Sequence, residues 1–177
     1  VVQLPPLEVL STIYITHQTT PDDIYDAKRL EVIAGKFYPK GKTTHSDLGI
    51  TDYGLVEPVL SAMQECGMVA CFHGAMPDDG KLKILEAETE LLFISKVLER
   101  IIKKFPNLRI VLEHISTAES ANMVVKKWPA NVAVTITPHH MLYNRNQLLV
   151  GGIKPHYYCL PILKHERDQI AVQQAAM

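Results

Sequence analysis

Three potential metal ligands stand where short apolar segments of the chain come to an end. Lys36 lies in VIAGKFYP, His73 in MVACFHG and His114 in RIVLEHIS. If these segments are parallel strands, their carboxyl ends meet at one rim and the three side chains gather there. Neighbouring parallel strands are about 4.8 Å apart, so the side chains could share one cation. Imidazole nitrogen suits zinc, which is therefore the metal that the pattern favours.

Lysine needs a chemical change before it can serve as a ligand, because its protonated amine is a hydrated cation. Burial and a nearby metal ion lower the pKa of such an amine, and the free amine can then add carbon dioxide to become a carbamate. A carbamate is a carboxylate on a long arm, and it could bridge two metal ions that activate a water molecule. Lys36 is therefore predicted to be both a metal ligand and a catalytic residue.

Simpler interpretations exist for each of these residues alone. A single histidine at a strand end is more often a hydrogen-bonded structural residue, and a lysine there is usually solvated. A rival motif, GKFYPKGKT at 35–43, is close to a phosphate-binding loop, but five residues rather than four separate Gly35 from Gly41. No apolar-periodic helix follows it, so a polar surface loop is the better interpretation of that stretch.

The elements that must position these residues alternate along the chain. Apolar, β-branched runs predict strands, and apolar spacing of three to four residues predicts helices. Gly67 and Thr117 are expected to cap a helix end and a helix start. The predicted strands are 9–16, 31–38, 68–73, 107–114 and 131–138; the predicted helices are 21–30, 53–67, 82–105 and 117–128, with a helical run at 164–177 and an irregular loop at 139–164.

Strand followed by helix, five times over, indicates an α/β fold with a parallel sheet and no internal domain boundary across 1–177. Length alone favours an open, doubly wound sheet, because an eight-stranded barrel typically needs about 250 residues. The chain begins with Val1 rather than Met and stops at Met177 inside a helical run, so we expect it to be part of a longer protein.

Composition excludes several classes of function. The 177 residues are 47% hydrophobic and 21% charged, with a net charge of -1, which gives no electrostatic reason to expect a nucleic acid or an anionic membrane as partner. No stretch approaches the roughly twenty apolar residues of a membrane span. The three cysteines lack the spacing of a disulfide framework or a zinc finger. A cytoplasmic protein that acts on a small molecule is expected.

Five strings in the chain, in this order, resemble the single-function bacterial type of dihydroorotase in the amidohydrolase superfamily: KFYPKGKTTHSDLGI, FHG, VLEHIST, TITPHHMLYNRN and VGGIKPHYYCLPILK. The resemblance runs from about Ser11 to Lys164. It implies a partial (β/α)8 TIM barrel, about strands 3 to 7, in place of the open sheet. It also implies that Lys36 is the carbamylated lysine that bridges two zinc ions, and that His73 and His114 bind one of them.

The resemblance assigns substrate contacts as well. Thr43 and Thr44 match a loop that closes over the substrate, and Leu160 matches a position whose backbone contacts the pyrimidine ring. The family's His-x-His pair, its carboxylate-binding arginine and its catalytic aspartate are missing from this sequence, so ligands for only one zinc are complete. Ala75 stands where many relatives have an acidic residue after the His-Gly pair.

The implied activity is the zinc-dependent, reversible cyclisation of N-carbamoyl-L-aspartate to dihydroorotate in pyrimidine biosynthesis. The expected partner is this small substrate, with no nucleic acid and no membrane, and a homodimer is possible. The missing ligands leave two alternatives open: a catalytically inactive, dihydroorotase-like scaffold subunit, and another cyclic amidohydrolase. The 177-residue segment alone is expected to be inactive.

Overall fold

The computed structural model of the protein describes residues 8–77 and 87–177. Its centre is a parallel, five-stranded sheet in which every strand pairs with the next one along the chain, in the order β1-β2-β3-β4-β5. The strands are β1 (Thr12–Ile15), β2 (Ala34–Phe37), β3 (Val69–His73), β4 (Ile110–Glu113) and β5 (Val132–Val134). A doubly wound sheet reverses its strand order at a switch point, so the expectation drawn from length alone is wrong.

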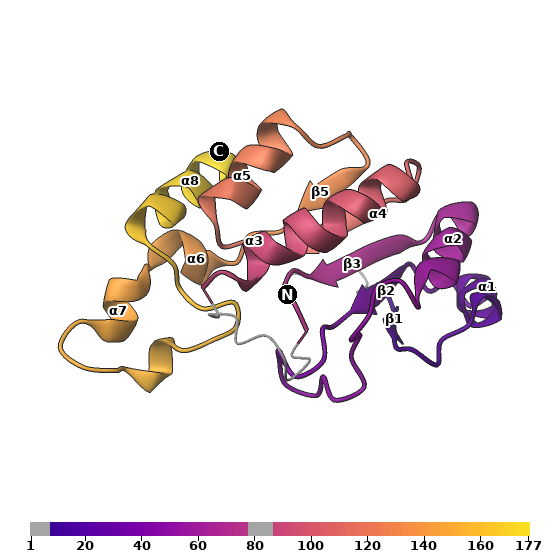
Figure 1. The fold of residues 1–177 in the computed structure, drawn as a ribbon, viewed down its shortest axis with the longest axis horizontal. Helices are drawn as coiled ribbons and strands as arrows, with labels where there is room; N and C mark the ends of the chain where they lie inside the picture. Colours follow the sequence, from indigo (N-terminus) through magenta and orange to yellow (C-terminus); the bar gives the residue numbers. More distant parts are fainter. Residues whose placement is uncertain (1–7, 78–86) are drawn as a thin grey trace, which may run out of the picture.

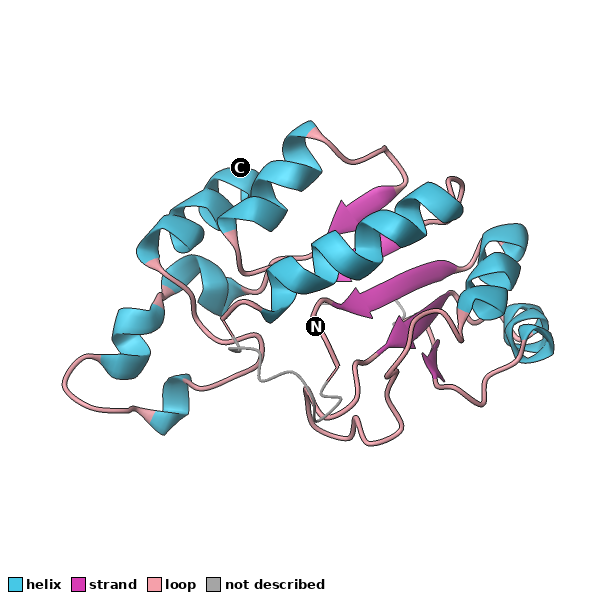
Figure 2. Cartoon of the chain, viewed as in Figure 1, coloured by secondary structure: helices cyan, strands magenta, loops and turns pink. Residues whose placement is uncertain are grey.

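Helices follow the strands and pack along the sheet (Figures 1 and 2). They are α1 (Pro21–Arg29), α2 (Glu57–Cys66), α3 (Thr89–Phe93), α4 (Glu99–Lys104), α5 (Ala118–Lys126), α6 (Pro138–Leu142), α7 (Arg145–Leu149) and α8 (Glu166–Ala176). A π-helical turn, η1 (Ile94–Leu98), joins α3 to α4, and a 3-10 turn, η2 (Pro155–Tyr157), follows α7. No helix within the described ranges is both long enough and apolar enough to span a membrane.

Local sequence signals place several helix ends. Thr20 caps α1 through a reciprocal pair of contacts with Asp23. Gly67 ends α2 with φ at 68°, a left-handed conformation that glycine adopts without a steric penalty. Thr117 caps α5, where its side chain accepts a hydrogen bond from the Ser120 amide. The predicted caps at Gly67 and Thr117 are thus confirmed.

The two faces of the sheet carry different chemistry. Lys36 lies opposite Cys71 in the register, and both are half-buried; the face that carries them is called the inner face below. Phe37, Phe72 and Leu112 form the next row, point to the opposite or outer face, and are 0% exposed. Because successive strand residues point to opposite sides, one row packs against helices while its neighbours lie on the inner face.

The outer face forms the core together with the helices. The rings of Phe37 and Phe72 are stacked with centroids 4.6 Å apart, and Phe93 of α3 lies 5.9 Å from Phe72. Tyr53 completes the aromatic group, 5.4 Å from Phe93. Aromatic pairs of this kind stabilise a fold beyond the area that they bury. This packing fixes the strands whose inner-face residues make up the site.

The chain after β5 is more ordered than its sequence indicated. The irregular loop predicted at 139–164 is wrong in part, because α6, α7 and η2 occupy much of it. Pro138 starts α6, and Asn144 caps α7 through a reciprocal contact with Gln147. Helices of one turn bury too few residues to leave a period in the sequence: α7 buries only Leu148. The helix predicted at 82–105 is confirmed from Thr89 onward, while 78–86 lie outside the described residues.

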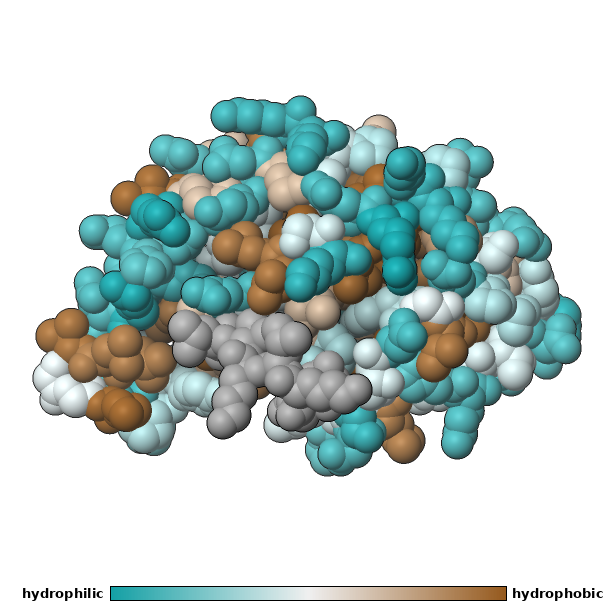
Figure 3. All heavy atoms as spheres, viewed as in Figure 1, coloured by the Kyte–Doolittle hydropathy of each residue, from teal (hydrophilic) through white to brown (hydrophobic). Residues whose placement is uncertain are grey.

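Exposed apolar side chains gather near α7 and η2, at the end of the molecule toward which the strands point (Figures 1 and 3). They include Leu149, Val150, Ile153, Tyr157 and Tyr158. Such groupings are uncommon on a surface that faces only water.

Candidate metal centre

Lys36 lies on the inner face of β2, one residue before the strand ends, so its predicted place at the strand terminus is corrected by one position. Its side chain is 12% exposed and forms an ion pair with the Glu113 carboxylate of β4. The Nζ atom also lies 4.9 Å from the centre of the Tyr38 ring. Burial lowers the pKa of Lys36 to about 8, while the adjacent carboxylate favours the charged amine.

His73 and His114 meet at the carboxyl ends of β3 and β4. Nδ1 of His73 and Nε2 of His114 are 3.1 Å apart, and the ring centroids are separated by 4.6 Å. Burial, followed by the neighbouring His114 and Lys36, lowers the pKa of His73 to about 3. Burial and then Lys36 lower the pKa of His114 to about 4. Both rings are therefore neutral near pH 7, which is the state in which imidazole binds a metal ion.

The spacing of the two rings fits a shared metal ion. Two nitrogen ligands of one tetrahedral zinc, each at 2.0–2.1 Å from the metal, lie about 3.3 Å apart; the facing nitrogens of His73 and His114 are 3.1 Å apart. The opposite nitrogens, His73 Nε2 and His114 Nδ1, are buried without a hydrogen-bond partner among the described residues. The pair could hold one cation with both facing nitrogens.

A third ligand could come from another residue type. Within residues 8–77 and 87–177, no group of three or more histidine, cysteine, aspartate or glutamate side chains is placed to hold a metal ion. Lys36 lies on the same inner face, and its charge reaches both imidazoles, since it contributes to lowering the pKa of each. A carbamate on Lys36 would supply the missing oxygen donor.

Glu113 is a site residue that the sequence reasoning missed. It pairs with His73 in the strand register, directly precedes His114 and contacts Lys36 through its carboxylate, so it belongs to the wall of the site. Strand alternation offered a signal, because Glu113 is two residues from the inner-facing Val111. Its pairing with Lys36 could be recognised only with the register known.

The predicted substrate residues line one open pocket of about 470 Å³. Its lining consists of Gly41, Thr43, Thr44, Tyr158, Cys159 and Leu160. A second pocket of about 380 Å³ is lined by Thr12, Tyr14, Lys36, Tyr38, Thr44 and His45. Because Thr44 lines both, the hollow that contains Lys36 adjoins the hollow that contains Leu160. The structure thus brings Thr43, Thr44 and Leu160 together, next to the lysine.

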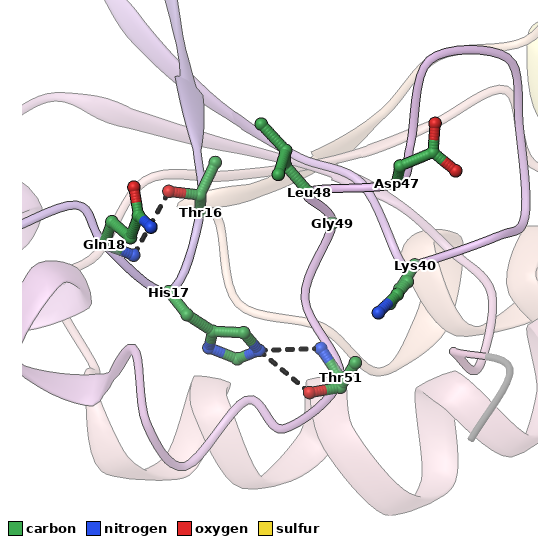
Figure 4. Close-up of a pocket in the computed structure, with 8 residues that line it drawn as sticks. All are labelled: Thr16, His17, Gln18, Lys40, Asp47, Leu48, Gly49 and Thr51. Carbon is green, nitrogen blue, oxygen red and sulfur yellow. Dashed lines mark hydrogen bonds between the residues drawn. The ribbon is translucent and has the colours of Figure 1, made fainter.

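A third pocket lies over the loops that follow β1 and β2 and contains none of the predicted site residues (Figure 4). In it, His17 Nε2 accepts a hydrogen bond of 2.9 Å from the Thr51 amide, and Lys40 and Asp47 line the opposite side. The stretch 35–43 runs from β2 into this loop region, and the next helix begins only at Glu57. The rival phosphate-binding interpretation therefore lacks the helix N-terminus that it needs.

His140 is a structural residue. It is 3% exposed, its Nδ1 lies 2.6 Å from the Thr137 hydroxyl, and its Nε2 lies 2.9 Å from the Pro161 carbonyl oxygen. A carbonyl oxygen can only accept, so Nε2 donates and Nδ1 accepts. His139 and His140 both lie in α6.

Comparison with known proteins places this geometry in context. No family model matches the chain. A dihydroorotase from Vibrio atlanticus is 51% identical over 168 residues, covering 94% of this chain and 48% of the relative. A dihydroorotase from Shewanella oneidensis is 49% identical over 175 residues, covering 98% of this chain and 49% of the relative.

A solved structure agrees with these relatives. The crystal structure of dihydroorotase from Saccharomyces cerevisiae, in complex with 5-fluoroorotic acid, has a TM-score of 0.83 and 30% identity, covering 94% of this chain and 48% of that one. The predicted fold class, a partial (β/α)8 barrel, is thereby confirmed. The chain spans about half the length of the curated relatives it matches. By sequence and by fold, the chain is therefore similar to about half of a dihydroorotase.

Proposed function

We propose that the protein to which this chain belongs is a dihydroorotase, which reversibly cyclises N-carbamoyl-L-aspartate to dihydroorotate in pyrimidine biosynthesis. The observation that carries the proposal is the meeting of His73 and His114, with facing nitrogens 3.1 Å apart, on the inner face that also carries Lys36. The sequence identity to curated dihydroorotases supports the same reaction.

Zinc is the metal that this donor set suits best. His73 and His114 would hold one ion through their facing nitrogens, and both rings are neutral near pH 7. When bound, zinc supplies a Lewis acid for the amide carbonyl of the substrate. A second ion would need ligands from outside this segment.

Lys36 is proposed to act as a carbamate. With its pKa lowered to about 8 by burial, a share of its side chain is the free amine near neutral pH. The amine nitrogen attacks the carbon of carbon dioxide, the new N–C bond forms, and the nitrogen releases one proton to solvent. The side chain then presents two oxygens where it had presented a cation, and the ion pair with Glu113 is lost.

Thr43, Thr44 and Leu160 are proposed to bind the substrate. They line the pocket next to the one that contains Lys36, and Thr44 belongs to both. Threonine hydroxyls and the Leu160 backbone supply the few directed hydrogen bonds that orient a small polar ring. A cytoplasmic location fits the three cysteines, which are all free thiols.

The direct test uses the full-length protein. We expect it to hydrolyse dihydroorotate and to form it from N-carbamoyl-L-aspartate, with zinc detected by mass spectrometry of the metal content. Dihydrouracil and hydantoin serve as competing cyclic substrates. A preference for either would favour another cyclic amidohydrolase, and a folded protein without turnover would favour the scaffold subunit.

A matched pair of histidine variants links activity to the site. His114→Ala removes one of the two facing nitrogens, whereas His17→Ala removes an exposed ring in the pocket that contains none of the predicted site residues. We expect the first variant to lose zinc and turnover together and the second to keep both. Equal loss in the two variants would contradict the assignment of His114.

A further inference from the structure

His114 has a backbone conformation that requires support. Its φ is 43°, in the left-handed region that residues other than glycine rarely adopt. Such a conformation costs free energy and persists where the surrounding structure determines it by several contacts. This conformation turns the chain away from β4 at His114, the residue whose ring contacts His73. The contacts that hold this turn therefore control the placement of the ring.

The first support comes from the chain after β5. The Thr135 hydroxyl accepts a hydrogen bond of 2.8 Å from the His114 amide, and the Thr135 carbonyl accepts one of 3.0 Å from the Ile115 amide. These two bonds fix the entrance to the turn. They leave its exit, at Ser116 and Thr117, to be held from elsewhere.

The second support is the carboxylate of Glu90 in α3. Glu90 is 2% exposed, and its oxygens accept hydrogen bonds from the Ser116 amide at 3.0 Å and the Thr117 amide at 3.2 Å. The hydroxyls of Ser116, Thr117 and Ser120 donate to the same carboxylate, that of Thr117 at 2.8 Å. Hydrogen bonds to a charged acceptor are about twice as strong as neutral ones, so this buried group is a firm anchor.

We propose that Glu90 is a positioning residue for the metal centre: by binding the amides and hydroxyls of Ser116 and Thr117, it holds the left-handed turn that aims the His114 ring at His73. Glu90 acts through the backbone and does not touch the metal or the substrate. The part of the inference that concerns zinc rests on the proposed function; the part that concerns the turn does not.

Glutamine is the informative replacement, since it keeps the size of glutamate but turns one acceptor oxygen into a donor. In Glu90→Gln, an amide group would face amide and hydroxyl donors that it cannot satisfy. The matched control is Glu88→Gln, which makes the same change at an exposed position in the same segment. Both variants are made in the full-length protein.

Two readouts are measured on the wild type and on each variant: the zinc dissociation constant, and amide hydrogen exchange at 114–117. We expect Glu90→Gln to raise the dissociation constant by about tenfold or more, as changes to residues supporting metal ligands do, and to speed exchange at 114–117. Excess zinc should restore much of its turnover, which it would not do for a general loss of folding. Glu88→Gln should match the wild type in both readouts.

The outcomes separate the two claims. If the wild type binds zinc and Glu90→Gln binds it equally well with unchanged exchange at 114–117, the positioning role is wrong. If the wild type binds no zinc, the proposed function fails, and the exchange result alone decides whether Glu90 holds the turn. If Glu90→Gln does not fold, Ser120→Ala removes a single donor to the carboxylate. It should give a smaller change in the same direction, and no change in either readout would overturn the inference.

Discussion

The inner and outer faces of the sheet are built from alternate residues of the same strands, yet the outer face forms the core and the inner face carries the candidate site. Phe37 and Phe72 on the outer face are completely buried against aromatic and aliphatic side chains. Lys36 and His73 are their immediate neighbours in the chain and carry polar groups. Burial lowers the pKa of both groups below the ordinary values. A strand of four or five residues can therefore hold the core with one face and the site with the other.

This division gives the two faces different sensitivities to substitution. Each large side chain on the outer face contributes about 1.5–3 kcal/mol by leaving water. The inner-face groups contribute little to the free energy of folding. Removing a charge from water costs free energy, and the attraction to its partner does no more than offset that cost. Changes on the outer face should therefore lower stability, and changes on the inner face should lower activity.

Lys36→Ala tests the inner face and should have the largest effect. We expect turnover of dihydroorotate by the full-length protein to fall by about a thousandfold, because the variant loses the carbamate proposed to bridge the metal ions. The melting temperature should stay near that of the wild type. Lys103→Ala, at an exposed position of α4, is the matched control and should leave turnover unchanged. Near-normal rates in Lys36→Ala would exclude its proposed role.

Phe72→Ala tests the outer face, one residue away from the proposed ligand His73. It removes a ring that stacks on Phe37 at 4.6 Å and contacts Phe93. We expect a loss of about 3–5 kcal/mol in the free energy of unfolding, measured with urea. The fraction that remains folded should keep its zinc and its KM for dihydroorotate. A loss below about 1 kcal/mol would show that the outer face does not form the core.

Gly35→Ala tests how closely α2 packs on the outer face. An added Cβ would lie 2.8 Å from Cε of Met63 and 3.0 Å from Cδ1 of Ile15. Because the Met63 end is flexible, we expect a modest loss of about 1–3 kcal/mol in the free energy of unfolding. Combining it with Met63→Ala should cost less than the sum of the two single changes, and strict additivity would show that the predicted contact does not form.

Much of this arrangement could be predicted from the sequence, for identifiable reasons. His73 and His114 are separated by 41 residues, but parallel strands bring their ends to one rim, and that rule was enough to expect them together. The caps at Gly67 and Thr117 are local signals that need no tertiary information. These features depend on the period of the strands and on helix termini, both of which a single sequence displays.

The residues that hold the site in place could not be predicted in this way. Glu90 lies 26 residues from Ser116, and an acidic residue near the start of a helix is an ordinary charge pattern. Glu113 was hidden because its partner Lys36 lies two strands away, and a contact that spans a strand is set by the register. Both pairings depend on tertiary packing, which a pattern along the chain does not record.

The most direct test of the account is an anomalous scattering measurement at the zinc edge on crystals of the full-length protein. We predict a peak between Nδ1 of His73 and Nε2 of His114, on the inner face and next to a carbamylated Lys36. A zinc peak elsewhere, or none in zinc-loaded crystals in which the two rings remain in contact, would contradict it.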